Sequence, residues 1–347
     1  MAVSRTQRLA FTGLQTARVA FYGAHYLAAR LAARDNFTAI RKPDHPMPSL
    51  AAIARAMTEL FARDWKNVEA GLYPAPLNIL KEARRAMASV SYLRDVPKVV
   101  NRQKRHGHSE AQEKADAKKL PRYFRQNFHY QTDGYLSEDS AKIYDFQVEA
   151  LFAGTAEAMR RRVYVPIAKY LEGRDAARTA LLDIGAGTGR FLSFVKSVQP
   201  ELKVTALDLS EPYLARAKRA LRHAKGAKFL EAAAEDMPLK DASVDIAVSI
   251  YLFHELPPKV RAAAAKQIVR VLKPGGIFIL ADTIQYGDAP EFDGLIDAFP
   301  ELLHEPYYKT YAQTDLGKLF GGLAHTSDDI AYLTKISTFE KPRRKPD

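Results

Sequence analysis

The segment 181-LLDIGAGTGRF-191 combines three structural signals in one short run. The apolar residues before Gly185 predict a buried parallel strand, and Gly185, Gly187 and Gly189 then interrupt it. From Arg190 to Val198 apolar residues recur at helical spacing, which predicts a helix directly after the turn. Glycines here allow a ligand to approach the backbone and the exposed N–H groups of the helix N-terminus. The segment therefore predicts a strand, a glycine turn and a helix that together receive a ligand.

The spacing of these glycines differs from the dinucleotide fingerprint G-x-G-x-x-G, whose third glycine would stand where the chain has Arg190. The pattern is instead D-x-G-x-G-x-G, and it begins at Asp183. A second apolar strand, 203–207, follows and is closed by Asp208. In open parallel sheets, an acidic residue about 20 positions after the glycine turn, at the tip of the second strand, binds a ribose diol. Asp208 is the candidate for this role.

From residue 179 onward, strand-like and helix-like segments alternate, as in a parallel sheet with helices on both faces. We expect further strands at 228–232, 244–250 and 277–282, helices at 211–224, 259–272 and 314–320, and a tight turn at 273–276. The segment 283–311 shows no clear periodicity. The stretches 323–326 and 330–340 predict a hairpin with its turn at 327–329.

Four ordered signals make residues from about 141 to 341 resemble the class I S-adenosylmethionine-dependent methyltransferases. They are the glycine motif, Asp208, A-E-x-M-P at 234–238 and L-K-P-G-G at 272–276. The resemblance implies an α/β fold with a doubly wound, mostly parallel, seven-stranded Rossmann-like methyltransferase sheet of order 3-2-1-4-5-7-6. Within the family, the HELP-type segment after the fourth strand resembles the ubiquinone- and menaquinone-biosynthesis branch (methyltransferase type 11/25). That branch modifies many small and lipidic acceptors.

The resemblance implies S-adenosyl-L-methionine as the cofactor, with the glycine turn beneath its amino-acid and ribose parts. The implied cofactor contacts are Asp183, Gly185, Ala186, Gly187, Gly189, Asp208, Leu209, Ala234, Glu235, Asp236 and Ser249. One position departs from the family pattern. Relatives often carry Asp or Asn two residues before the Glu of the A-E motif, where the side chain reaches the adenine amino group, and this chain has Ala233 there. Adenine recognition therefore falls to the backbone at Ala234 and to Glu235 or Asp236.

Methyl transfer is an in-line displacement at a carbon that its sulfonium already activates. The protein aligns donor and acceptor, excludes water and, for a hydroxyl or acidic-carbon acceptor, removes a proton. His254 follows the fourth strand, at the carboxyl edge where an open parallel sheet places its site. It is the candidate for a catalytic base or an acceptor-orienting group. The alternative is that His254 packs beneath the cofactor and caps the following helix.

Two aromatic segments are candidates for the acceptor pocket. One precedes the cofactor domain and is typical of a lid that excludes water, or else of an anchor between the accessory region and the core. The other, HEPYYKTY, follows the fifth strand. The expected pocket residues are Phe128, His129, Tyr130, Tyr135, His304, Tyr307, Tyr308 and Tyr311. Together they would form an aromatic chamber that suits a ring or an acyl chain, although each tyrosine alone fits equally well as a core residue.

Composition and length bound the rest of the chain. The 347 residues include no cysteine, which excludes disulfides, thiolate chemistry and cysteine-ligated zinc and suits a cytoplasmic location. We expect no metal site. The length favours one catalytic domain with an accessory region. The expected parts are a helical accessory region (1–95), a basic linker or exposed helix (96–121), an aromatic lid and lead-in helix (122–178), the methyltransferase domain (179–341) and a basic tail (342–347). Within the third part we expect one long helix at 149–171.

The net charge of +12 favours anionic partners. The first 34 residues contain arginines and no acidic residue, and their uncharged run, 19–29, is shorter than the roughly 20 residues of a transmembrane helix. We expect this helix to pack on the protein or to lie in a membrane interface, unless it is a transit segment.

Three functions fit these observations. The leading one is methyl transfer to a small or lipid-like acceptor that is aromatic, quinone-like or acyl. The second is methylation of RNA or another nucleic acid, which the basic charge favours. The segment after the fourth strand lacks the N/D/S-P-P-Y/F motif of amino-methylating enzymes, which disfavours base methylation at an exocyclic amine and leaves other nucleic-acid chemistries open. The third is a non-catalytic cofactor-binding scaffold.

Overall fold

The computed structural model describes residues 4–33, 42–113 and 120–343, and the chain divides into two compact units. Unit 1 is Met1–Met159 with Asp297–Glu305, and unit 2 is Arg160–Ile296 with Pro306–Asp347. The expected linker and basic tail lie partly outside the described residues, at 114–119 and 344–347.

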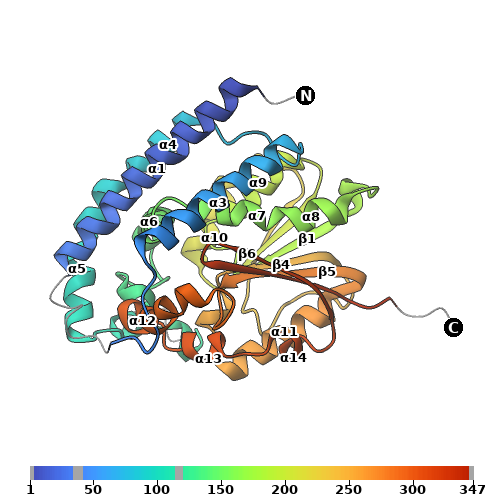
Figure 1. Cartoon of the computed structure of the whole chain (residues 1–347). Helices are drawn as coiled ribbons and strands as arrows, with labels where there is room; N and C mark the ends of the chain where they lie inside the picture. The colour runs from blue at the N-terminus through green and yellow to red at the C-terminus, as the bar shows by residue number, and fades with distance from the viewer. Residues whose placement is uncertain (1–3, 34–41, 114–119, 344–347) are drawn as a thin grey trace. The chain divides into compact units, whose positions relative to one another are not determined.

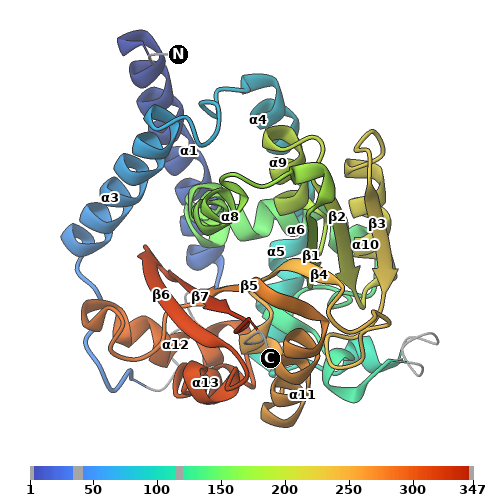
Figure 2. The same ribbon diagram turned by 90° about the vertical axis from the view of Figure 1, so that its right-hand side faces the viewer.

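Unit 2 is built on a seven-stranded sheet of order β3-β2-β1-β4-β5-β7-β6 (Figure 1). The strands are β1 (Ala180–Ile184), β2 (Lys203–Asp208), β3 (Ala227–Glu231), β4 (Val244–Ile250), β5 (Leu272–Thr283), β6 (Ala324–Ala331) and β7 (Thr334–Glu340). The pairs among β1 to β5 are parallel, and β7 runs antiparallel to β5 and β6. In Figure 2, β3 lies at one edge and β6 at the other. The topology confirms the expected fold.

Burial explains why the central strands are mainly apolar. Leu181, Leu182 and Ile184 of β1 and the run 246–248 of β4 are buried, as in a parallel sheet covered on both faces. The helices of unit 2 are α8 (Tyr164–Leu171), α9 (Arg190–Val198), α10 (Glu211–Ala220), α11 (Pro258–Val271), α13 (Tyr308–Ala312) and α14 (Leu316–Leu319), and α12 (Asp293–Leu303) joins unit 1 from residue 297 onward.

Unit 1 is helical among its described residues. Its helices are α1 (Arg5–Ala32), α3 (Leu50–Glu69), α4 (Ile79–Ala86), α5 (Ser89–Arg105), α6 (Glu138–Leu151) and the start of α7 (Ala156–Arg162), with short 3-10 turns at η1 (Glu110–Glu113), η3 (Arg122–Phe124) and η4 (Phe128–Tyr130). Helix α1 packs on this unit. Its Phe11 ring lies 5.1 Å from the Trp65 ring, and its Tyr22 ring lies 5.2 Å from the Phe146 ring.

The opposite side of α1 carries the exposed residues Leu9, Leu27 and Leu31. Membrane contact through this side stays a prediction. Among the described residues, no helix combines the length and the apolar character that a bilayer crossing requires.

A buried ion pair ties α1 to the rest of unit 1. The Arg18 guanidinium lies 2.8 Å from Glu149 Oε2 and also contacts the Glu82 carboxylate. It donates a further hydrogen bond to the Gly154 carbonyl at 3.4 Å. Arg18 and Glu149 are both almost fully buried, so each depends on the other for charge compensation.

Three sequence-based expectations were wrong in detail. The long helix expected at 149–171 is divided into α6, α7 and α8, because the chain turns at residues 152–155 and presents the Gly154 carbonyl to Arg18. Residues 96–105 belong to helix α5, so the linker expected from residue 96 does not begin there. The alternative of an exposed helix holds in part, since Arg102 within it is buried. The hairpin turn lies at 332–333 rather than 327–329, because the pairing of β6 with β7 continues to Ala331.

Replacement of Arg18 by Leu leaves the buried Glu149 carboxylate without its ion-pair partner. We expect the free energy of unfolding of unit 1 to fall by about 3–5 kcal/mol, measured by chemical denaturation. Arg8→Leu, at an exposed position of the same helix, is the control and should change stability by less than about 0.5 kcal/mol. Equal effects of the two substitutions would contradict this account of the ion pair.

Candidate active site

The glycine turn between β1 and α9 leaves an open space beside its middle residue. Gly187 and Gly189 have φ angles of 53° and 74°, in the left-handed region that favours glycine. A Cβ on Gly189 would lie 2.8 Å from the Cβ of Ala217, so this glycine is required for packing on α10. A Cβ on Gly187 would meet no heavy atom of the described chain within 4 Å. The turn is therefore packed on one side and open at Gly187.

Asp208, at the end of β2, ties the glycine turn to the start of α10. Its Oδ2 accepts a hydrogen bond from the Gly187 N–H at 2.7 Å, and its Oδ1 accepts one from the Ser210 N–H at 2.8 Å. Each carboxylate oxygen has a second lone pair that can accept a hydroxyl group of a ligand. The side chain thus has the position and the acceptor capacity that a ribose diol requires.

Two neighbouring carboxyl groups at this edge of the sheet are held in an unfavourable environment for negative charge. Burial raises the pKa of Asp208 to about 6, although the Ser210 and Gly187 N–H groups oppose the shift. Burial and the charge of Asp208 raise the pKa of Asp183 to about 7, with Arg160 opposing the shift. A cationic ligand nearby would favour the ionised form of both groups. Shifts of this kind are typical of functional sites.

The other expected cofactor contacts lie at the same edge of the sheet. Ser249, near the end of β4, is buried and donates a hydrogen bond through its Oγ to the Ile184 carbonyl at 3.2 Å. The Ala232 N–H donates to the Asp208 carbonyl at 3.1 Å, which holds the turn 234–236 next to the end of β2. The structure thus brings these residues together, and their cofactor contacts stay predictions.

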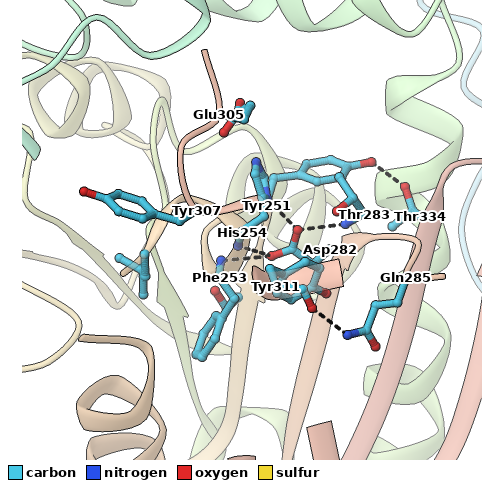
Figure 3. Close-up of polar contacts among 12 residues, drawn as sticks. Tyr251, Phe253, His254, Asp282, Thr283, Gln285, Glu305, Tyr307, Tyr311 and Thr334 are labelled. Carbon is cyan, nitrogen blue, oxygen red and sulfur yellow. Dashed lines mark hydrogen bonds and ion pairs between the residues drawn. The ribbon is translucent and has the colours of Figure 1, made fainter. Parts of the chain in front are cut away.

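His254 lies in the short 3-10 turn η6 (Phe253–Glu255) and is oriented by a carboxylate (Figure 3). Its Nδ1 lies 2.5 Å from Oδ1 of Asp282, which is fully buried near the end of β5. The Asp282 Oδ2 accepts a hydrogen bond from the Phe253 N–H at 2.9 Å. When Nδ1 donates its proton to Asp282, Nε2 is the ring nitrogen that can take up another proton. The pair has the geometry of a histidine base with a carboxylate partner.

Aromatic rings surround His254 in unit 2. The ring centroids of Tyr308, Tyr311 and Tyr251 lie 5.8, 6.3 and 6.5 Å from that of the imidazole. Burial, followed by the charge of Asp282, raises the pKa of Tyr311 well above its usual value, so this phenol stays protonated. Its hydroxyl is buried and has no hydrogen-bond partner among the described residues. The wall beside His254 is therefore mainly apolar.

Sequence reasoning missed Asp282 and Arg261. Asp282 ends the apolar run of β5, a position at the carboxyl edge that could have drawn attention to it. Arg261 is buried in α11 and donates to the Phe253 carbonyl at 3.0 Å and to Thr314 Oγ1 at 2.9 Å. It thereby joins the turn that carries His254 to the segment after α13. No sequence signal marked Arg261, because its partners lie outside α11.

The expected acceptor residues fall into two groups. Tyr307, Tyr308 and Tyr311 belong to unit 2, whereas Phe128, His129, Tyr130, Tyr135 and His304 belong to unit 1. Within unit 1 the Phe128 and Tyr135 rings stack at 5.6 Å, and His129 Nε2 lies 3.0 Å from Glu305 Oε1. Burial, with the adjacent His108, lowers the pKa of His304 to about 4. A chamber that contains both groups stays a prediction.

Comparison with known proteins gives consistent matches. Residues 182–280 match the model of a family described as a methyltransferase domain. Carboxy-S-adenosyl-L-methionine synthase of Aeromonas hydrophila is 35% identical over 135 residues, which are 36% of this chain and 53% of the relative. Demethylmenaquinone methyltransferase of Staphylococcus aureus is 29% identical over 168 residues, or 48% and 63% of the two chains.

The chain thus spans between half and two thirds of the length of these curated relatives. Among solved structures, a SAM-dependent methyltransferase from Aquifex aeolicus is 20% identical with a TM-score of 0.36, and the match covers 47% of this chain and 81% of that one.

Replacement of Gly187 by Ala places a methyl group in the open space of the turn. We expect the dissociation constant for S-adenosylmethionine to rise at least about tenfold, a loss of roughly 1.4 kcal/mol, measured by calorimetry. Gly173→Ala is the matched control, because Gly173 also has a positive φ, of 69°, and open space around it but follows α8. Both substitutions should lower the stability of the fold by a similar amount. Equal affinities of the two variants for S-adenosylmethionine would contradict the assignment of Gly187 to the cofactor site.

The raised pKa of Asp208 predicts a pH-dependent affinity. Only the ionised carboxylate has its full capacity to accept hydrogen bonds from a diol, so protonation below a pKa of about 6 weakens binding. Calorimetric titration should show the affinity for S-adenosylmethionine increase from pH 5 to pH 7. Asp208→Asn should bind about 10- to 100-fold more weakly at pH 7 and lose most of this dependence. An equally steep pH profile in that variant would assign the titration to another group.

Proposed function

We propose that this chain transfers the methyl group of S-adenosyl-L-methionine to a small or lipid-like acceptor. The match of residues 182–280 to the model of a family described as a methyltransferase domain supports this proposal. The observation that supports this activity best is the His254–Asp282 pair, which lies at the same carboxyl edge of the sheet as the glycine turn and Asp208. The apolar wall of Tyr308 and Tyr311 beside His254 favours an acceptor that is aromatic, quinone-like or acyl.

The residues present fit the cofactor on three grounds. Gly187 leaves open space where a side chain would stand. Asp208 keeps acceptor capacity on both carboxylate oxygens, and the adjacent Asp183 carboxyl would be ionised more readily beside a sulfonium cation. When bound, S-adenosylmethionine supplies a methyl group activated by its sulfonium. In the proposed site Asp208 binds the ribose hydroxyls and the glycine turn allows the ligand to approach its backbone N–H groups.

His254 is proposed to serve as the base for a hydroxyl or acidic-carbon acceptor. Nε2 of His254 would take up the proton of the acceptor group that receives the methyl group. Asp282 holds Nδ1 and stabilises the imidazolium that results. The buried rings of Tyr308 and Tyr311 exclude water from this side of the site.

The acceptor class is supported by one relative in particular. Demethylmenaquinone methyltransferase is named for a quinone-type acceptor, and its matched region covers 48% of this chain. Nothing among the described residues singles out a polymer substrate over a ring or a chain. Incubation with labelled S-adenosylmethionine distinguishes such an acceptor from a nucleic acid.

His254→Gln should lower kcat by about 10²- to 10⁴-fold while it changes the affinity for S-adenosylmethionine less than about twofold. Asp282→Asn should also lower kcat and shift the pH profile of the reaction, because the carboxylate no longer stabilises the imidazolium. His223→Gln, an exposed position in the same unit, is the control. Normal turnover by His254→Gln would instead indicate that His254 only packs in this turn.

The activity itself is tested by incubation of the full chain with cell extract and S-adenosylmethionine that carries an isotope-labelled methyl group. Mass spectrometry should find the label in organic-phase molecules with a ring or an acyl chain, and the Gly187→Ala variant should reduce it. Label recovered mainly in RNA would replace the proposed acceptor with a nucleic acid. Binding of the cofactor without any labelled product would favour the non-catalytic scaffold.

A further inference from the structure

Unit 1 contains a cavity of about 170 Å³ that the proposed transfer reaction does not use. Helices α1, α5 and α6, which pack on one another, supply most of its wall (Figure 1). The apolar lining consists of Tyr26, Ala29, Ala33, Tyr92, Val96, Val99, Val100, Tyr144, Val148, Leu151, Phe299, Leu302 and Leu303. An engineered apolar cavity of about 150 Å³ holds one benzene molecule. The cavity in unit 1 therefore has room for a ligand of about one aromatic ring.

Two buried oxygen atoms of cavity-lining residues have no hydrogen-bond partner among the described residues. They are Oδ2 of Asp95, on α5, and Oε1 of Gln147, on α6. A buried polar atom without a partner is costly, and such atoms in native structures usually mark a ligand or water site. Both of these atoms are acceptors, so the missing partner is a hydrogen-bond donor.

The surrounding contacts explain why Asp95 keeps one oxygen unpaired. Its Oδ1 accepts a hydrogen bond from Thr132 Oγ1 at 2.5 Å. Thr132 Oγ1 in turn accepts one from Arg102 Nη1 at 2.9 Å, and Arg102 Nε donates to Glu110 Oε2 at 2.6 Å. The Arg102 guanidinium thus donates to Glu110 and Thr132, and it makes no hydrogen bond to Asp95 Oδ2.

The charges of the cavity also select the ligand. Asp95 would repel an anionic group placed close to its carboxylate. Arg30, the cationic residue of the lining, is exposed, and its guanidinium lies over the Tyr26 ring. An acid would therefore meet the negative charge of Asp95 inside the cavity, and the cationic residue of the lining, Arg30, is exposed. A neutral molecule with one donor group fits the cavity better.

We propose that this cavity binds a neutral, hydroxyl-bearing aromatic molecule of about one ring, a simple phenol, whose hydroxyl donates a hydrogen bond to Asp95 Oδ2 or Gln147 Oε1. The ring lies among the apolar side chains of α1, α5 and α6. The residues that line this site belong to unit 1 and the residues assigned to methyl transfer belong to unit 2, and the proposal stands whether or not the chain transfers a methyl group. Of the residues expected at the acceptor, His129 alone lines the cavity.

The test compares two probes of nearly equal size, 4-ethylphenol and 4-ethyltoluene, which differ by a hydroxyl in place of a methyl group. Calorimetry on the full-length protein should show that 4-ethylphenol binds at least about tenfold more tightly, because only its hydroxyl supplies the donor. Equal affinities would show that the two oxygen atoms do not select the ligand. Absence of 4-ethylphenol binding at its solubility limit would overturn the site.

Variants locate the binding. Val99→Phe fills the cavity and should abolish binding of 4-ethylphenol, whereas Val90→Phe, at an exposed position of the same helix, should leave it unchanged. The double substitution Asp95→Leu and Gln147→Leu removes both acceptors and should reduce the preference for 4-ethylphenol over 4-ethyltoluene to about onefold. Thermal unfolding verifies that each variant is folded. Unchanged 4-ethylphenol binding by folded Val99→Phe, or an unchanged preference in the folded double variant, would overturn the proposal.

Discussion

The two hydrogen bonds that Asp208 accepts hold the functional edge of unit 2 together. One comes from Gly187 in the turn after β1, and the other comes from Ser210 at the start of α10. A single carboxylate thereby fixes the glycine turn against the end of the neighbouring strand. The same contacts leave it buried, with a raised pKa and with lone pairs still available. Its structural role and its proposed role in binding a diol thus follow from one position at the tip of β2.

The second constraint is the contact of His254 with Asp282. His254 follows β4 and Asp282 lies near the end of the neighbouring strand β5, so the parallel sheet itself brings the imidazole and the carboxylate together. Arg261 then holds the turn that carries His254, through its bond to the Phe253 carbonyl. A carboxylate, a histidine and a supporting guanidinium come from three separate elements. Their arrangement gives the base a defined tautomer and leaves an aromatic wall beside it.

Local sequence signals predicted the glycine turn and the position of Asp208, because each depends on residues close together in the chain. The sheet order was predicted from the family resemblance. Asp282 and Arg261 were missed because their partners lie on other elements. The Gly154 carbonyl accepts a hydrogen bond from Arg18, more than a hundred residues earlier, and no local pattern predicts such a contact. The cavity in unit 1 was missed for the same reason. Val96, Val99 and Val100 stand in a charged stretch, and only the packing of α1, α5 and α6 shows that they line a hollow.

The central claim is that the crevice beside Gly187 and Asp208 binds a sulfonium nucleoside rather than a dinucleotide. Calorimetric titration of the unmodified full-length protein with S-adenosylmethionine, and separately with NAD, tests it most directly. The account predicts one S-adenosylmethionine site per chain, with a dissociation constant of about 1–100 μM, the range of many enzyme ligands, and no detectable heat with NAD. Binding of NAD with equal or higher affinity, or no binding of S-adenosylmethionine, would contradict it.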